Sequence, residues 1–109
     1  PLMLVGDRQT GKTYILDEFC RKEFNSYVYI NLEKEEELRA IFEKTINEEK
    51  IIEELELYIG RKIDVDKTLL FFDEVQVSEN FIVSLKYFNE SSKPYKIICA
   101  GSLLRSKNK

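Results

Sequence analysis

The sequence predicts an α/β fold with a parallel sheet, and three observations support this prediction. Short apolar runs alternate along the chain with segments whose apolar residues recur at helical spacing. One of these runs, Thr68–Phe72, is continuous, which is typical of a strand covered on both faces. A glycine-containing stretch separates the first apolar run from the first helical segment. Strands that alternate with helices form parallel sheets with right-handed crossovers, and 109 residues suffice for one domain over 1–109.

The first part of the chain is expected to hold two strands and the helix between them. Leu2–Val5 is a short apolar run that predicts a buried strand. The following segment has apolar residues at helical spacing with charged residues between them, which predicts an amphipathic helix; the apolar positions are Tyr14, Ile15, Leu16, Phe19 and Cys20. Ser26–Leu32 is rich in β-branched and aromatic residues and predicts the second strand.

The middle of the chain is expected to be helical. Leu38, Ile41, Phe42 and Ile46 fall at helical spacing, and a second set continues it: Ile51, Ile52, Leu55, Tyr58 and Ile59. The pattern predicts one long helix, or two helices that divide near Asn47, with an end at Gly60. In the polar loop that follows, Asp64 and Asp66 are expected to be turn residues rather than metal ligands.

The last part of the chain is expected to add two strands and a helix. Thr68–Phe72 is the third strand, and Ser78 is in the position of a helix N-cap. The helix is expected to end before Pro94, and Tyr95–Ala100 predicts the fourth strand.

Residues 6 to 13 form the strongest motif in the sequence. They read Gly6-Asp7-Arg8-Gln9-Thr10-Gly11-Lys12-Thr13 and match G-x-x-x-x-G-K-[ST] in full. In this pattern backbone N–H groups turn inward around nucleotide phosphates, Lys12 adds positive charge, and the Thr13 hydroxyl offers an oxygen to Mg²⁺. The strand before it and the helix after it direct the positive end of a helix dipole at the same anion. The sequence therefore predicts a phosphate site built from these eight residues and Tyr14.

Two acids follow the third strand. Asp73 and Glu74 are expected at the carboxyl edge of the sheet, where ligands bind in open α/β sheets. Asp73 is expected to hold Mg²⁺ through water, because Mg²⁺ keeps several of its waters. Glu74 can polarise a water for in-line attack on the γ-phosphate. Alone, the pair is equally consistent with a strand-to-helix cap, and the motif upstream favours the catalytic interpretation.

Ser102 follows the fourth strand, where its hydroxyl could reach the attacking water or the γ-phosphate. A serine after a glycine is equally typical of a turn, so both interpretations stand.

Composition narrows the classes of function. The net charge of −3 gives no electrostatic support for nucleic-acid binding. The sequence shows no signal peptide and no apolar run of about eighteen residues, so no membrane segment is expected. Its two cysteines, Cys20 and Cys99, are expected to be buried free thiols, which favours a cytoplasmic location. Histidine is absent, which excludes imidazole bases, Ser-His nucleophiles and His-ligated zinc.

These motifs resemble the nucleotide-binding core of a group of bacterial and archaeal AAA+-type P-loop ATPases, whose members typically carry a C-terminal domain of unknown function. The resemblance covers most of the chain and rests on the motif at 6–13 and on the stretches 57–64, 68–76, 85–88 and 97–104. The Asp-Glu-Val-Gln piece at 73–76 and the Ala-Gly-Ser-Leu-Leu piece at 100–104 are its most specific parts.

The resemblance implies a three-layer α/β/α fold whose four-stranded parallel sheet has the spatial order 2-3-4-1. It also implies ATP and Mg²⁺ as cofactors and Mg²⁺-dependent hydrolysis of ATP. Glu74 would be the catalytic glutamate, Ser102 would occupy the sensor-1 position, and Lys12 would assist at the phosphates.

The sequence departs from the family pattern in ways that bear on activity. Asp7 stands where the family usually has proline or another small residue, and a fifth strand, a lid and an arginine finger are not found in it. The expectation is a truncated core that binds nucleotide, turns it over weakly, and would form a homo-oligomer through regions absent from this sequence. Two alternatives remain: a nucleotide-dependent switch or interaction module, and a small-molecule kinase, which Glu74 beside Asp73 disfavours.

Overall fold

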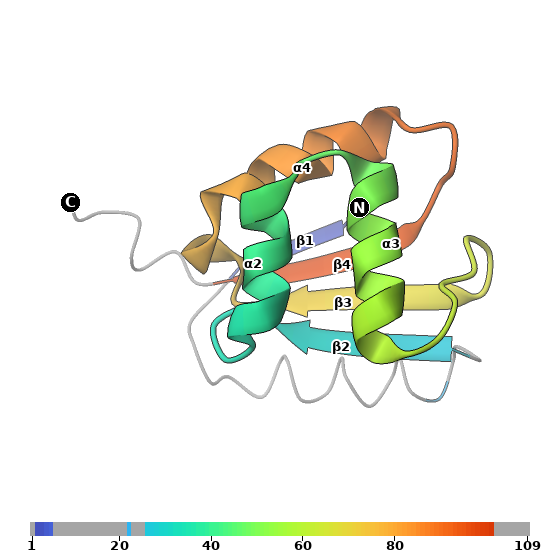
Figure 1. The fold of residues 1–109 in the computed structure, drawn as a ribbon, viewed down its shortest axis with the longest axis horizontal. Coiled ribbons are helices and arrows are strands. Elements are labelled where there is room, and N and C mark those ends of the chain that lie inside the picture. The colour runs from blue at the N-terminus through green and yellow to red at the C-terminus, as the bar shows by residue number, and fades with distance from the viewer. Residues whose placement is uncertain (1, 6–21, 23–25, 102–109) are drawn as a thin grey trace.

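The computed structural model describes residues 2–5, 22 and 26–101. Figure 1 shows a parallel sheet with helices α2, α3 and α4 over one of its faces. The strands are β1 (Leu2–Val5), β2 (Ser26–Asn31), β3 (Thr68–Asp73) and β4 (Lys96–Gly101). The helices are α2 (Glu36–Lys44), α3 (Glu48–Ile59) and α4 (Glu79–Glu90), with the short 3-10 helix η1 (Val75–Val77) between β3 and α4.

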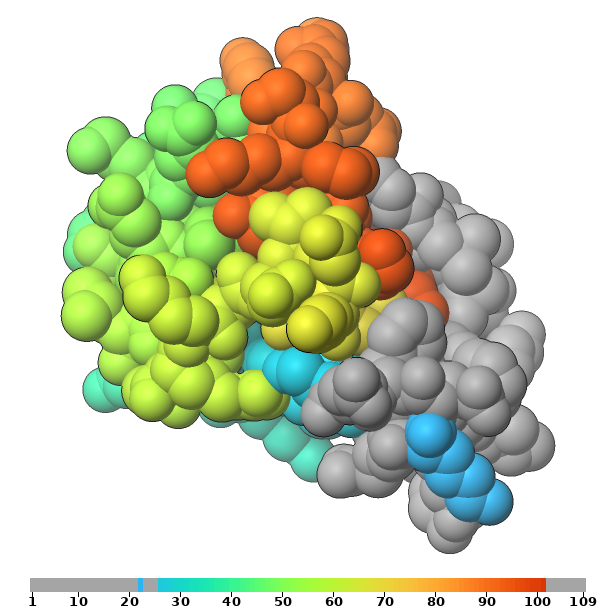
Figure 2. All heavy atoms as spheres, turned by 90° about the vertical axis from the view of Figure 1, so that its right-hand side faces the viewer, coloured from blue at the N-terminus to red at the C-terminus, as the bar shows by residue number. Residues whose placement is uncertain are grey.

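The sheet brings the ends of its strands to one edge. Its order is β1-β4-β3-β2, which is 2-3-4-1 counted from β2, and each neighbouring pair is parallel. The register pairs Asn31 with Asp73 and Val5 with Gly101, so these carboxyl ends lie at the same edge, hereafter the carboxyl edge. Figure 2 shows the opposite edge, where the α3–β3 loop (yellow-green) and the segment entering β4 (orange) lie.

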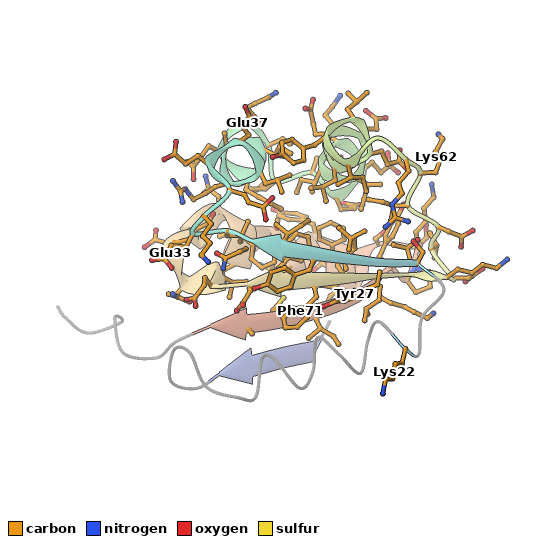
Figure 3. The ribbon with its side chains drawn as sticks, turned by 90° about the horizontal axis from the view of Figure 1, so that it is seen from below. Lys22, Tyr27, Glu33, Glu37, Lys62 and Phe71 are labelled. Carbon is orange, nitrogen blue, oxygen red and sulfur yellow. The ribbon has the colours of Figure 1, made fainter. Side chains whose placement is uncertain are left out.

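The described residues supply the sheet and one helical layer. Figure 3 shows α2 and α3 above the sheet, with Tyr27 and Phe71 toward the other face. The helix predicted from Tyr14 to Cys20 lies outside the described residues, so a second helical layer stays a prediction. Within the described part of the chain, none of the helices has the length and apolar character needed to cross a membrane.

Local signals explain where the helices begin and end. Asn47 caps α3, because its Oδ1 accepts from the backbone N–H of Lys50 at 3.0 Å, and the helical region is therefore divided in two. Gly60 ends α3 in the left-handed conformation, with φ 78°. Ser78 caps α4, since its Oγ accepts from Phe81 N at 3.1 Å, as the sequence predicts.

Several boundaries differ from the sequence prediction. By one residue each, β2 ends at Asn31 rather than Leu32, β3 continues to Asp73, and β4 ends at Gly101 rather than Ala100. Ile46 lies outside both helices because Thr45 is extended (φ −156°, ψ 152°) and its Oγ1 accepts from Asn47 N at 3.0 Å. Tyr95 lies outside β4 because its N–H donates to the carbonyl of Lys93 in a tight turn. In the α3–β3 loop, Asp64 accepts from two backbone N–H groups and is a turn residue, as predicted.

An aromatic cluster fixes β3 beneath the helices. Phe72 points from β3 into the helical layer, where it meets Phe81 of α4 at a ring separation of 4.7 Å and Phe42 of α2 at 5.9 Å. Phe42 and Phe81 also pack edge to face at 5.0 Å, and all three side chains are fully buried. Because Phe72 directly precedes Asp73, this apolar packing also fixes the strand end that carries Asp73.

Candidate functional site

Asp73 is a buried carboxylate with hydrogen bonds at both oxygens. It is the last residue of β3 and is only 6% exposed. Its Oδ1 accepts from the backbone N–H of Glu74 at 2.8 Å, and its Oδ2 accepts from the hydroxyl of Tyr29 at 2.6 Å. A carboxylate offers about four lone-pair directions. Both oxygens therefore keep acceptor capacity while the two hydrogen bonds fix the orientation of the group.

Tyr29 is a partner of Asp73 that the sequence analysis missed. In the β2–β3 register Tyr29 lies opposite Phe71, two residues before Asp73, so it shares a face with both. Its ring packs edge to face on Phe71 at 5.4 Å, which directs the hydroxyl along the sheet toward the carboxylate. Strand alternation in the sequence places Asp73 on the same face of its strand as Phe71, but only the register of β2 on β3 shows that Tyr29 lies on that face.

Glu74 departs from the ordinary backbone conformations. Its φ of 54° and ψ of 46° lie in the left-handed region, where it is the one non-glycine residue of the described chain with a positive φ. This conformation costs a residue with a Cβ about 1–2 kcal/mol. Glu74 also precedes η1 and accepts from Val77 N at 3.4 Å. Glycine or asparagine would adopt this conformation more easily. The presence of a glutamate here therefore indicates that its side chain is needed at this position.

The side chain of Glu74 is held by Gln76. The amide Nε2 of Gln76 donates to Glu74 Oε1 at 2.7 Å, and both residues are half-buried. Gln76 in turn lies against the end of β4: a Cβ built on Gly101 would be 2.8 Å from Gln76 Oε1. In the sequence Gln76 stands out only as part of a motif, because its contact with Gly101 cannot be deduced from spacing.

At the carboxyl edge, the end of β2 is held by hydrogen bonds from a turn and from α2. Asn31, the register partner of Asp73, uses its Oδ1 to accept from Glu33 N and Lys34 N, so it forms a turn. Arg39 donates from Nη1 to the carbonyls of Leu32 and Glu33 at 2.8 and 3.1 Å. Arg39 of α2 thus holds the segment that follows β2 in place.

The structure brings together part of the predicted site. Asp73 and Glu74 lie side by side at the carboxyl edge, between the ends of β2 and β4. The other predicted site residues lie outside the described residues: Gly6, Asp7, Arg8, Gln9, Thr10, Gly11, Lys12, Thr13, Tyr14 and Ser102. The described strands that flank them end at the same edge, since Val5 pairs with Gly101. Over residues 2–5, 22 and 26–101, three or more His, Cys, Asp or Glu side chains do not gather in a metal-binding cluster.

Comparison with protein families shows the family to which the chain belongs. The family described as AAA domain matches residues 1–109, so the chain belongs to this family of AAA-type, P-loop ATPase-like, nucleotide-binding domains. A search of curated protein sequences gave no match.

Proposed function

We propose that this AAA domain hydrolyses ATP with the help of Mg²⁺, water being the nucleophile. The observation that carries the proposal is the acid pair at the end of β3. Asp73 is buried and fixed by two hydrogen bonds, whereas Glu74 is half-buried and held separately by Gln76. Two adjacent carboxylates with separate supports suit two separate tasks, one at a metal and one at a water.

The chemistry of Asp73 fits a magnesium ion bound through water. Mg²⁺ takes few carboxylates and retains several waters, and such waters can donate to the lone pairs that Tyr29 and Glu74 N leave unused. When bound, Mg²⁺ would neutralise charge on the phosphate oxygens. Thr13 is proposed as the second protein group at this metal.

Glu74 is proposed to orient and polarise the attacking water. Its Oε1 accepts from Gln76, and its Oε2 is the oxygen proposed to accept from the water. Because Glu74 directly follows the proposed metal-binding Asp73, water and nucleotide would meet at this strand end. Lys12 is proposed to stabilise charge at the phosphates, and Ser102, after β4, to contact the γ-phosphate or the water.

The test is phosphate release from Mg²⁺-ATP by the full-length protein and four variants. Glu74→Gln keeps the size of the side chain but removes its capacity as a base, and it should lower kcat about 100-fold or more. Asp73→Asn should raise the concentration of Mg²⁺ needed for half-maximal phosphate release, and Lys12→Ala should weaken nucleotide binding. Glu90→Gln, the same change at an exposed position of α4, is the matched control and should leave kcat unchanged.

Nucleotide binding is measured separately by thermal unfolding with and without Mg²⁺-ATP. A site filled at about 100 times its dissociation constant adds about 2.7 kcal/mol to the free energy of unfolding. Binding without phosphate release would contradict the proposed hydrolysis and would support the nucleotide-dependent switch. Equal turnover in Glu74→Gln and the intact protein would show that Glu74 is not the base.

A further inference from the structure

We propose that Gln76 is a positioning residue for Glu74 and that Gly101 makes the room in which Gln76 sits. This inference rests on the proposed function, since it assigns Gln76 a part in presenting the carboxylate to water. Three residues from two strand ends are involved: Glu74 and Gln76 follow β3, and Gly101 ends β4.

The hydrogen bond from Gln76 restricts the rotation of the Glu74 side chain. A glutamate has three side-chain torsions, and ordering such a side chain costs conformational entropy. At 2.7 Å the amide of Gln76 engages one carboxylate oxygen, Oε1. An amide donor suits this task, because it holds the carboxylate without delivering a full positive charge that would weaken it as a base. Gln76 therefore fixes where the carboxylate points and leaves it able to polarise water.

The left-handed backbone of Glu74 brings the two side chains together. With φ 54° and ψ 46°, Glu74 turns the chain sharply out of β3 and into η1. Gln76 is the second residue of that short helix, two positions along, and its amide returns to the carboxylate. The unusual backbone of Glu74 and the bond to Gln76 thus belong to the same local arrangement, which explains why a glutamate occupies this conformation.

Gly101 is needed for space rather than for backbone freedom. Among the described glycines Gly60 has a positive φ and Gly101 does not, so an alanine could adopt the backbone of Gly101. Its Cβ, however, would lie 2.8 Å from Gln76 Oε1 and 3.2 Å from Val75 Cγ2. A separation of 2.8 Å is too short for a carbon against an oxygen, so the Gln76 amide would have to move. Gly101 therefore leaves room for the Gln76 amide at the position from which it reaches Glu74.

The experiment measures kcat and KM for Mg²⁺-ATP in the full-length protein and in variants at the two positions. Gln76→Ala removes the donor, and Gln76→Glu keeps the length of the side chain but replaces the donor by an acceptor. Both should lower kcat about 10- to 100-fold, the range expected when a catalytic group is displaced by about 1 Å, with KM changed by less than about 3-fold. Gly101→Ala should lower kcat in the same direction.

The double variant Gln76→Ala/Gly101→Ala separates this mechanism from independent damage. If Gly101 acts through Gln76, adding Gly101→Ala to Gln76→Ala should lower kcat by less than about 3-fold, because the side chain it would displace is already gone. The matched control is Asn80→Ala. It removes a hydrogen bond of the same kind, Asn80 Nδ2 to Glu43 Oε1 at 3.1 Å, which joins α4 to α2, and it should leave kcat unchanged.

The outcomes distinguish this inference from the function on which it rests. An intact protein that releases phosphate while Gln76→Ala and Gln76→Glu keep its kcat would overturn the role of Gln76 alone. A rise in KM with unchanged kcat would overturn it equally, because it would assign Gln76 to nucleotide binding. An intact protein that binds ATP but releases no phosphate would overturn the proposed hydrolysis and this role together. Thermal unfolding of each variant establishes that it is folded, and should Gly101→Ala fail to fold, the two Gln76 variants decide the question.

Discussion

The helical layer and the carboxyl edge of the sheet are held by different forces. In the helical layer Phe42, Phe72 and Phe81 pack in mutual contact, fully buried. At the carboxyl edge Asp73 and Glu74 are held by directional hydrogen bonds, and Glu74 takes a left-handed backbone that a glutamate adopts at a cost. In the helical layer a loss of side-chain volume lowers stability. At the carboxyl edge the backbone of Glu74 is strained and the side chains are held by hydrogen bonds.

This difference predicts which substitutions change stability and which change turnover. Substitutions in the helical layer should lower the free energy of unfolding, and substitutions at the edge should change turnover with modest effects on stability. Where active-site residues are strained, replacing them commonly raises stability while activity is lost. The following variants test this division, from the largest expected effect on stability to the smallest.

Phe42→Ala should be the most destabilising of these changes. It removes a fully buried ring that contacts both Phe72 and Phe81, so the free energy of unfolding should fall by about 3–5 kcal/mol. Denaturant unfolding measures it. Val83→Ala on α4 is the control, because Val83 is 45% exposed and its loss should cost less than about 0.5 kcal/mol. Equal costs for the two variants would contradict the assignment of Phe42 to the core.

Alkaline pH should destabilise the fold through Cys99. Burial raises the pKa of the Cys99 thiol from 9.0 to about 12. A pKa raised in the folded state means stability that is complete below the unfolded pKa and is lost as pH rises from about 9 to 12, by up to about 1.4 kcal/mol per pH unit. The pKa of Tyr95 is also raised, by burial and by Glu56, Glu49 and Glu48, and Tyr95 adds to the loss in the same direction.

Unfolding by denaturant at a series of pH values measures this dependence. Cys99→Ala should flatten the decline between pH 9 and 12, and Tyr95→Phe should flatten it further. A decline that is as steep in the Cys99→Ala variant as in the intact protein would show that the thiol does not carry it.

Tyr29→Phe should weaken the support of Asp73. The change removes the 2.6 Å hydrogen bond to Oδ2 but keeps the ring on Phe71, so it should cost about 1.5 kcal/mol of stability. The concentration of Mg²⁺ needed for half-maximal phosphate release should rise, because Asp73 loses part of its orientation. Tyr58→Phe on the exposed side of α3 is the control and should change neither quantity.

Glu74→Asn should raise stability while it removes activity. Asparagine tolerates the left-handed region better than glutamate, so the free energy of unfolding should rise by about 0.5 kcal/mol, the lost bond from Gln76 offsetting part of the gain. Glu74→Gln keeps the backbone cost and should leave stability nearly unchanged. A Glu74→Asn protein less stable than Glu74→Gln would contradict this prediction.

Most of the fold could be predicted because its signals are local. Asn47, Gly60 and Ser78 mark helix ends by hydrogen bonds or backbone angles that involve residues at most four positions away. The apolar run of β3 predicts a strand that is buried at every position, and it is. The sequence prediction is wrong at Ile46, which lies beyond the C-terminal end of α2, and at Tyr95, which lies before β4. Thr45 and the Lys93–Tyr95 turn interrupt patterns that continue in the sequence.

The sequence by itself predicted a phosphate-binding motif and placed two acids after an apolar strand, because both are contiguous patterns. Only the tertiary structure decided how those acids are held. Tyr29 reaches Asp73 across 44 residues, through the register of β2 on β3. Gln76 meets Gly101 because β4 lies next to β3 in the sheet, although the two residues are far apart in the chain. The first contact depends on strand register, and the second depends on the space left by a glycine, which has no Cβ. The periodicity of the sequence encodes neither.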